Sequence, residues 1–573
     1  MSEPGNIESS RELLLNAQKQ GAGSTIKAFV KLSGPGWLQS AITLGGGSLA
    51  GSLFLGVLGG TSMIWLQLIA IFMGVVMLSA ISYVTLSTGE RPFRAINQHI
   101  NPVLGWGWLI ATMMANMIWC MPQFSLCYAA LQKNLLGSAL PDSNNSKLIV
   151  SGVILVLTFI VVQLNRRPGP GLKIFDRVLK ALVGMIVICF FGVVVLMLGK
   201  GQLDIAAIIA GFTPDFGQFS RPTGTIAEII AGLQTSAGEF WSGRIVQEQR
   251  AVMIGAAATA VGINMTFLLP YSMLNRGWDK PFRGLARFDL STGMAIPYIL
   301  VTSCVVIAAA ASFHAQAPDE QLASSDPAVM TQSPMFDKVR KTLAARVQHE
   351  LGADAWSTMD EAAQQAAMAA LPTAEKQLAL SLVQRDAFQL SQSLAPLLGE
   401  QLANVIFGLG VFGMGFSTII ILMLINSYAL CEAINQPQSS QPAFSIGALL
   451  AGLAGASWPF IWDGPSKLWL AILTSSFGMM LLPIAYITFM MMMNSKSLMK
   501  DEKPRGLSML IWNVLMGISV AGACAAAWTA VSDKSKDPTA GPVVIAVGVI
   551  FIVAVIIGFM KKKNNASSEQ AAV

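Results

Sequence analysis

The chain contains little charge for its length. Of its 573 residues, 12% are charged and 53% are hydrophobic, whereas soluble domains carry roughly 25% charged residues. This composition excludes a disordered or collagen-like chain and argues against a large soluble enzyme. The net charge of +6 is small, and the basic residues stand in short loops between apolar runs. The sequence therefore gives no indication of nucleic-acid binding.

Histidine and cysteine are also scarce. The three histidines fall in predicted loops or at loop edges, and the six cysteines lie in or beside apolar segments without a CxxC pair. We expect buried thiols rather than disulfides or zinc ligands. The sequence contains no P-loop, no HExxH motif and no GxSxG elbow. We therefore predict that the protein is not an enzyme and uses no cofactor.

Long apolar segments are what the sequence has in abundance. A membrane helix needs about 20 apolar residues, and twelve candidates lie at about 35–58, 62–87, 105–131, 148–164, 178–199, 252–274, 291–313, 402–429, 443–462, 468–493, 508–530 and 542–560. The 148–164 and 443–462 segments are the weakest. We predict an all-α integral membrane protein with about twelve transmembrane helices.

Basic residues indicate how the chain crosses the membrane. They are concentrated in the N-terminal segment, in the loops at 276–287 and 496–505, and at 561–563, whereas the alternate short loops hold far fewer. By the positive-inside rule both termini are cytoplasmic. The N-terminus has no apolar signal-peptide core, and with the compact loops it favours a bacterial inner (plasma) membrane.

Two predicted extramembrane segments lie on the outer side. Residues 200–251 include an amphipathic stretch from Thr225 to Arg250, expected on the membrane surface or against the bundle. Residues 314–401 are acidic and predict a small helical subdomain, either a solvated cap or a surface that concentrates cations. The predicted units are a cytoplasmic segment 1–32, helices 1–5 in 33–199, the external loop 200–251, helices 6–7 in 252–313, the insertion 314–401, helices 8–10 in 402–493, helices 11–12 in 494–560 and a cytoplasmic tail 561–573.

Two helices carry residues that interrupt helical structure. The first has Gly45, Gly46 and Gly47 at mid-span, and the sixth has Gly262, Asn264 and Pro270. Unwound backbone at membrane depth can hold an ion where it lines a cavity. The alternative is that the small residues only allow close helix packing. Interrupted helices at the first position of each group of five are typical of inverted-repeat transporters, which predicts two inverted five-helix repeats plus two C-terminal helices.

Four stretches occur in a distinctive order: GPGWL at 34–38, RGLARFD at 283–289, the segment from Leu397 to Thr418, and the helix and loop at 468–500. Together they resemble the Nramp family (natural resistance-associated macrophage proteins) of divalent-metal transporters, within the LeuT-like architecture of the APC superfamily. The resemblance covers about residues 30–310 and 395–530. It implies a secondary transporter that works by alternating access.

The chain departs from the family at the positions that the resemblance assigns to the metal site. The first-helix motif DPGN is replaced by Gly45, Gly46, Gly47 and Ser48, and the sixth-helix motif MPH falls on Gly262, Ile263 and Asn264. The third-helix acids fall on Asn116 and Gln123. A second register would place the sixth-helix break at 236–238, near Glu239. The predicted substrate-binding residues are Gly45, Gly46, Gly47, Ser48, Gly262, Asn264, Asn116 and Gln123.

These replacements bear on the substrate. Divalent transition metals prefer carboxylate, imidazole and sulfur ligands, and the aligned positions carry no carboxylate, histidine or thioether. A weakly held hydrated divalent ion, a monovalent ion and a small solute remain alternatives. Thr43, Ser417 and Thr418 are candidates for a monovalent ion site, unless the hydroxyls only bond their own helix backbone.

The function predicted first is a secondary membrane transporter of the Nramp type, moving a (divalent) metal cation through a site at residues 43–48 and 261–265. One alternative is a sodium-coupled carrier of a small organic solute. The other is a non-transporting membrane receptor in which the external insertion binds the ligand. The predicted partners are the transported ion or solute and the lipid bilayer.

Overall fold

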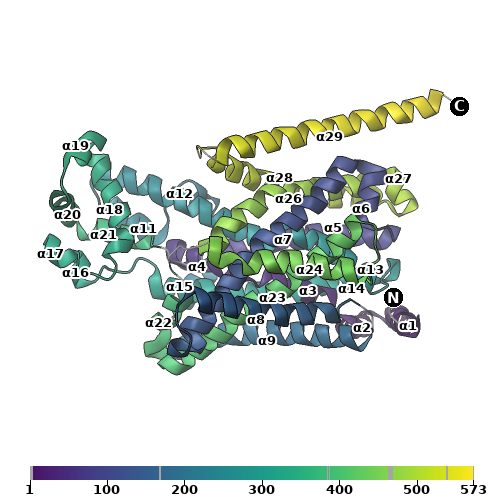
Figure 1. The fold of residues 1–573 in the computed structure, drawn as a ribbon, viewed down its shortest axis with the longest axis horizontal. Coiled ribbons are helices and arrows are strands. Elements are labelled where there is room, and N and C mark those ends of the chain that lie inside the picture. The colour runs from purple at the N-terminus through teal and green to yellow at the C-terminus, as the bar shows by residue number, and fades with distance from the viewer. Residues whose placement is uncertain are drawn as a thin grey trace.

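A computed structural model describes residues 4–166, 169–383, 385, 387–461, 469–536, 538 and 540–571. The described residues are helical with no strand, so the all-α expectation is confirmed. Residues 462–468, between the ninth and tenth expected helices, and the last two residues of the expected tail lie outside the described residues. Figure 1 shows a helical bundle with a smaller group of helices at one end, and both chain termini toward the opposite end.

Most expected spans have a helix of the right length and composition. Among the described residues, ten helical segments are long and apolar enough to cross a membrane, or eleven if the bent first pair is counted as one span. The short apolar helix α24 (Gln441–Ala456) corresponds to the ninth, weakly predicted span. The ten comprise α5 (Trp65–Thr88), α7 (Pro102–Ala130) continued to Leu135, α8 (Asn144–Leu164), α9 (Pro170–Gly199), α12 (Thr235–Ala260) with α13 (Ile263–Asn275), Lys280–Phe313 with α14 (Arg283–Leu290) and α15 (Ile296–Phe313), α23 (Glu400–Ala433), the part of α26 (Trp469–Asn494) from Phe477, α28 (Gly506–Ser535), and the part of α29 (Ala540–Ala571) from Gly541 to Lys561.

The first membrane helix is broken where the glycines predict it. It consists of α3 (Pro35–Thr43) and α4 (Gly46–Gly59), and the chain bends by 53° between them. The other glycines of α4 serve close packing: a Cβ on Gly51 would lie 2.9 Å from Cα of Ala256 in α12. Both uses of small residues, a break and a close helix contact, therefore occur in this one segment.

The sixth membrane helix is also broken, but it begins earlier than expected. Its first half is α12, its second half is α13, and Val261 and Gly262 separate them. The predicted span at 252–274 therefore covers only part of a longer helix. Residues 236–238 lie inside continuous α12, so the second register for the break is wrong. Figure 1 shows α12 running out of the bundle toward the outer group of helices.

That outer group is built from the insertion and the outer part of α12. Its helices are α11 (Gly224–Ala231), α16 (Glu320–Ala323), α17 (Pro327–Met330), α18 (Phe336–Leu351), α19 (Ala353–Thr358), α20 (Glu361–Ala369) and α21 (Thr373–Ser381). Ile226 and Trp241 share one apolar core with Leu343 and Leu378. The amphipathic stretch at 225–250 is thus divided between α11 and α12, and its apolar residues pack on the insertion.

A buried ion pair stands inside this outer core. The Glu375 carboxylate accepts hydrogen bonds from Nε of Arg346 (2.6 Å) and from Nε1 of Trp241 (2.7 Å), and both charged side chains are at most 5% exposed. The core ends near Val383. The next helix, α22 (Ala387–Leu398), packs with α23 instead, and its Leu390 and Leu394 belong to the membrane core. The helical unit is therefore shorter than the 314–401 insertion.

Shorter helices complete the connections. They are α1 (Pro4–Gln20), α2 (Ala22–Leu32), α6 (Pro92–Ala95), α10 (Ile205–Ala210), α25 (Trp458–Ile461) and α27 (Lys496–Met499). At the centre of the bundle, α23 contacts α3, α7, α9 and α24. This arrangement brings α23 and α7 against the break of the first helix, which is where the site is formed.

Candidate functional site

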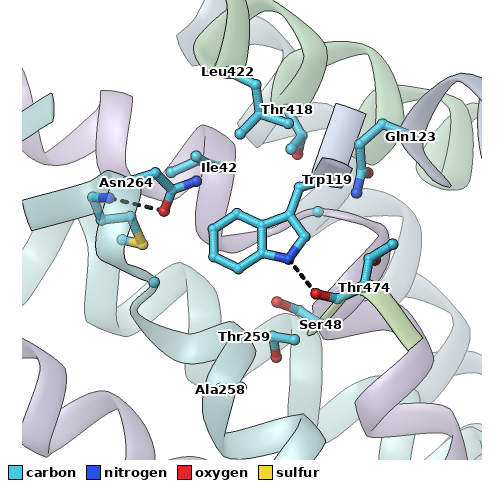
Figure 2. Close-up of a pocket in the computed structure, with 14 residues that line it drawn as sticks. Ile42, Ser48, Trp119, Gln123, Ala258, Thr259, Asn264, Thr418, Leu422 and Thr474 are labelled. Atoms are coloured by element: carbon cyan, nitrogen blue, oxygen red, sulfur yellow. Dashed lines mark hydrogen bonds between the residues drawn. The ribbon is translucent and has the colours of Figure 1, made fainter. Parts of the chain in front are cut away.

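A small cavity lies where the two broken helices meet. Its volume is about 50 Å³, which is room for a few waters or a small ion and far less than the roughly 300–1,000 Å³ of organic-ligand pockets. Figure 2 shows its lining, drawn from α3, α4, α7, α12, α13, α23 and α26. The lining residues are Ile42, Gly45, Gly47, Ser48, Trp119, Gln123, Ala258, Thr259, Gly262, Asn264, Met265, Thr418, Leu422 and Thr474.

Gln123 of α7 stabilises the break in the first helix. In an unbroken helix the Gly46 N–H would donate to the carbonyl of Ile42. Here it donates to Oε1 of Gln123 at 2.9 Å. A Cβ on Gly46 would lie 3.0 Å from that oxygen, so glycine permits the close approach. The amide thus supplies the acceptor for the N-terminus of α4 and releases the Ile42 carbonyl, whose residue lines the cavity.

Two helix C-termini face this cavity. α3 ends at Thr43 and α12 ends at Ala260, and residues of the last turn of each line the space. The last carbonyls of a helix lack intrahelical partners and carry partial negative charge. Asn264 begins the other half of the sixth helix, and its Oδ1 accepts the Met265 N–H at 2.8 Å. The N-terminal turns of α4 and α13 also line the cavity, so a cation would bind at the carbonyl ends of α3 and α12.

Met265 corrects the expectation that the site lacks sulfur. It stands one residue after the aligned sixth-helix motif, lines the cavity, and its Sδ accepts a hydrogen bond from Oγ1 of Thr43 at 3.5 Å. The motif aligned to the family ends at Asn264, so the sulfur of Met265, one position later, falls outside it. Met265 could have been predicted from its position in the first turn after the break, because side chains there face the gap between the half-helices.

The hydroxyls of α23 contact the first helix. Oγ of Ser417 donates to the carbonyl of Ala41 at 2.9 Å. Oγ1 of Thr418 lies 2.8 Å from the Met414 carbonyl and 3.3 Å from that of Ala41. Thr418 therefore bonds its own helix and also reaches α3, and the monovalent ion site stays a prediction. Thr418 lines the cavity, whereas Ser417 and Thr43 stand beside it without lining it.

Asn116 is placed apart from the other predicted residues. It is fully buried, and its Nδ2 donates to Oδ1 of Asn426 in α23 at 2.8 Å. It does not line the cavity. This contact joins α7 to α23 by a hydrogen bond between amides, which is the interhelical role that polar side chains commonly take in membrane bundles.

Trp119 occupies the centre of the site. Figure 2 shows its indole between Asn264 on one side and Gln123 and Thr474 on the other. Its Nε1 donates to the carbonyl of Thr474 at 2.9 Å. A Cβ on Gly262 would lie 2.7 Å from the ring, and one on Gly478 only 1.8 Å from it. Two glycines on different helices thus make room for the indole, which limits the size of the cavity.

The cavity wall carries no ionisable side chain. Its polar groups are backbone, amide, hydroxyl and thioether groups, and the described residues contain no cluster of three or more His, Cys, Asp or Glu side chains that could hold a metal. Neutral oxygens suit hard cations, and a cation that meets no carboxylate keeps more of its hydration shell. The thioether adds one ligand that favours softer ions.

A buried carboxylate stands at the start of the first helix. Asp289 of α14 is 1% exposed and accepts hydrogen bonds from the N–H groups of Gly34 (3.1 Å) and Gly36 (2.6 Å) and from Oγ of Ser33. It therefore anchors the N-terminus of α3, where a negative charge is favourable. A Cβ on Gly36 would lie 2.1 Å from the Asp289 carbonyl oxygen. In the sequence Asp289 stands in the basic motif RGLARFD, which gives no sign of this role.

Comparison with known proteins gives the family. The profile of the natural resistance-associated macrophage protein-like (Nramp) family matches residues 36–345 and 362–529. The chain belongs to the Nramp family. It is therefore a membrane transporter of metal ions, as the resemblance implied, and the organic-solute carrier and the receptor are not favoured. No match was found among curated proteins.

Solved structures agree on the fold. The structure of a manganese transporter from Eremococcus coleocola in complex with an aromatic bis-isothiourea compound is similar with a TM-score of 0.60 and 13% identity, covering 94% of each chain. Two single-site mutants of that transporter are similar with TM-scores of 0.58 and 12% identity, covering 93% of each chain. At this identity the likeness establishes the shared architecture of this Nramp chain.

Proposed function

We propose that this Nramp protein transports a partly hydrated metal cation through the cavity between the broken helices. The observation that carries the proposal is that the C-termini of α3 and α12 converge on a space of about 50 Å³ with no ionisable side chain in its wall. Helix-end carbonyls attract a cation, while the missing carboxylates leave its charge less neutralised. A hard divalent ion such as Mg²⁺, which retains several waters when bound, fits this chemistry.

Uptake into proteoliposomes tests the proposal. The panel is Mg²⁺, Ca²⁺ and Mn²⁺, each with and without a proton or sodium gradient. We expect saturable uptake of at least one divalent ion, with an affinity in the weak range typical of sites without carboxylates. Absence of any divalent flux from folded protein would overturn the cation proposal and direct attention to other solutes.

Two amide variants locate the site. Gln123→Ala removes the acceptor of the Gly46 N–H, and Asn264→Ala removes a cavity-lining oxygen. Each is expected to lower uptake about tenfold or more while the protein still elutes as a folded species. The matched control is Gln348→Ala, an exposed amide of the insertion. If the control and the site variants lose uptake equally, the cavity is not the site.

Met265→Leu tests the thioether separately. Leucine has nearly the same volume but no sulfur. A softer ion such as Cd²⁺ should lose affinity relative to Mg²⁺, because only the softer ion gains from a sulfur ligand. An unchanged ratio of Cd²⁺ to Mg²⁺ uptake would show that the sulfur does not contact the ion.

The membrane orientation is also part of the proposal. Both termini lie toward one end of the molecule and the insertion lies at the other (Figure 1), which supports termini and insertion on opposite sides of the membrane. The basic residues of the N-terminal segment and of 561–563 place the termini on the cytoplasmic side. Lys341 in the insertion and Lys561 in the last helix are both exposed. A membrane-impermeant thiol reagent added to whole cells should label Lys341→Cys and leave Lys561→Cys unlabelled, and the reverse pattern would invert the topology.

A further inference from the structure

A second, much larger cavity lies away from the ion site. Its volume is about 610 Å³, within the usual range of small-molecule pockets. It is enclosed by α5, α12, α26, α28 and the short helix Phe216–Phe219. Small residues of α28 leave the space open, and the larger side chains around it are almost all apolar. Its lining includes Trp65, Met73, Phe216, Met253, Tyr486, Gly522, Ala523 and Ala526.

A polar cavity adjoins the apolar one. It has a volume of about 460 Å³, and Arg250 and Thr529 line both spaces. Its wall includes serine hydroxyls, Gln247 and Lys536. Arg250 Nε donates to the carbonyl of Phe219 at 2.5 Å, and Lys536 Nζ lies 3.2 Å from Oδ1 of Asp533. Two cationic groups and one carboxylate therefore stand at the end of an apolar cavity.

We propose that these joined cavities bind one anionic phospholipid. An acyl chain would occupy the apolar cavity, and the phosphate would lie beside Arg250 and Lys536. An apolar cavity beside a polar one with cationic groups in its wall matches the two parts of such a lipid. Basic pockets between transmembrane helices commonly receive anionic lipid headgroups. The mouth stands at the end of α28 and on the part of α12 that leads to the external insertion, which assigns the lipid to the outer leaflet.

The bound lipid would contact the half-helix that also lines the ion cavity. The apolar cavity is lined by α12 from Arg250 to Val261, the residue at the break of the sixth helix. The opposite side of the same half-helix ends at the ion cavity through Ala258 and Thr259. A lipid that binds one position of α12 better than another shifts the balance between transporter conformations. The lipid site itself stands independently of which ion is carried.

Native mass spectrometry of the full-length protein tests the site. Delipidated protein is titrated with dioleoyl phosphatidylglycerol or dioleoyl phosphatidylcholine. We expect one phosphatidylglycerol to bind about tenfold more tightly than phosphatidylcholine. Arg250→Gln combined with Lys536→Gln should reduce this preference to near unity. The matched control is Arg244→Gln with Lys534→Gln, two exposed charges on the same helices that line neither cavity.

Filling the apolar cavity is the second arm. Ala526→Phe should abolish the tight adduct of either lipid, whereas Ala521→Phe, on an exposed position of α28 outside the lining, should leave it unchanged. A tight adduct retained by Ala526→Phe, or a preference retained by the double charge variant, would overturn the proposal. So would a fatty acid or detergent molecule in place of the phospholipid in protein purified from membranes.

A fluorescence measurement covers the case in which Ala526→Phe does not fold. Trp65 is 1% exposed and lines the apolar cavity. Phosphatidylglycerol with brominated acyl chains should quench its emission, measured as the difference between the native protein and Trp65→Phe. A quenching difference of zero at saturating lipid would exclude an acyl chain from this cavity.

Discussion

Replacing Asp289 should release the start of the first membrane helix. In Asp289→Ala the N–H groups of Gly34 and Gly36 and the hydroxyl of Ser33 lose their shared acceptor in a buried position. Each buried backbone N–H left without a partner costs about 1–3 kcal/mol. The two N–H groups together therefore predict a loss of about 2–6 kcal/mol of stability.

This loss converts into a measurable melting shift. With an unfolding entropy of about 2.1 cal/mol/K per residue, 573 residues give about 1.2 kcal/mol/K. The expected fall in the melting temperature of detergent-solubilised protein is therefore roughly 2–5 °C. Asp289→Asn should lie between the native protein and the alanine variant, because it keeps one acceptor oxygen but loses the charge that favours a helix N-terminus.

Asp279→Ala is the matched control. Asp279 lies ten positions earlier and pairs with Arg11 at 2.6 Å, but its side chain is 42% exposed. An exposed pair contributes about 1 kcal/mol or less, so the melting temperature should change by about 1 °C at most. Equal shifts for Asp279→Ala and Asp289→Ala would refute the anchoring role assigned to the buried carboxylate.

Three further predictions follow from packing, charge and protonation. Gly478→Ala places a Cβ 1.8 Å from the Trp119 ring and should reduce metal uptake severalfold. Adding Trp119→Phe to the same chain should restore part of the uptake. If neither change affects uptake, the indole is not part of the site. Glu375→Gln leaves the buried Arg346 with Glu350, 56% exposed, as its charged partner. Loss of the charged hydrogen bond should loosen the insertion core by about 1.5–3 kcal/mol, seen as faster hydrogen exchange there, whereas the exposed Glu361→Gln should change exchange little. Burial lowers the pKa of His314 below its usual 6.5, so the unfolded chain binds this proton more readily than the folded protein. The contribution of His314 to stability is therefore full above pH 6.5 and should be lost as the pH falls. His314→Gln should make the melting temperature less dependent on pH in this range, and an unaltered slope would contradict the assignment.

Local sequence was sufficient for most of the spans, for the break in the first helix and for one of two candidate breaks in the sixth, and only the structure excluded the other candidate at 236–238. Apolar segment length is set by bilayer thickness, and three consecutive glycines weaken a helix wherever they stand. The break in the first helix, with Gly46 at the start of α4, and the break before Asn264 could therefore be predicted from neighbouring residues. The beginning of the sixth helix could not, because α12 continues past the apolar segment into contact with the insertion.

The contents of the site depended on long-range packing. Gln123 meets Gly46 across 77 residues of sequence, and Asp289 meets Gly36 across 253. Trp119 enters the cavity only because Gly478, on a distant helix, leaves space for its ring. Such contacts arise from how helices pack, which no local pattern specifies.

The sequence by itself determined the apolar spans, the glycine breaks and the lack of charge around them, because each depends on the chemistry of a short segment. Only the tertiary structure decided three further features. Gln123 accepts the hydrogen bond of the Gly46 N–H, Met265 contributes a thioether to the cavity wall, and α12 packs into the core of the insertion. The physical reason is that a side chain's role is set by the groups it meets once distant helices are packed together, and the sequence pattern of one helix does not contain those groups.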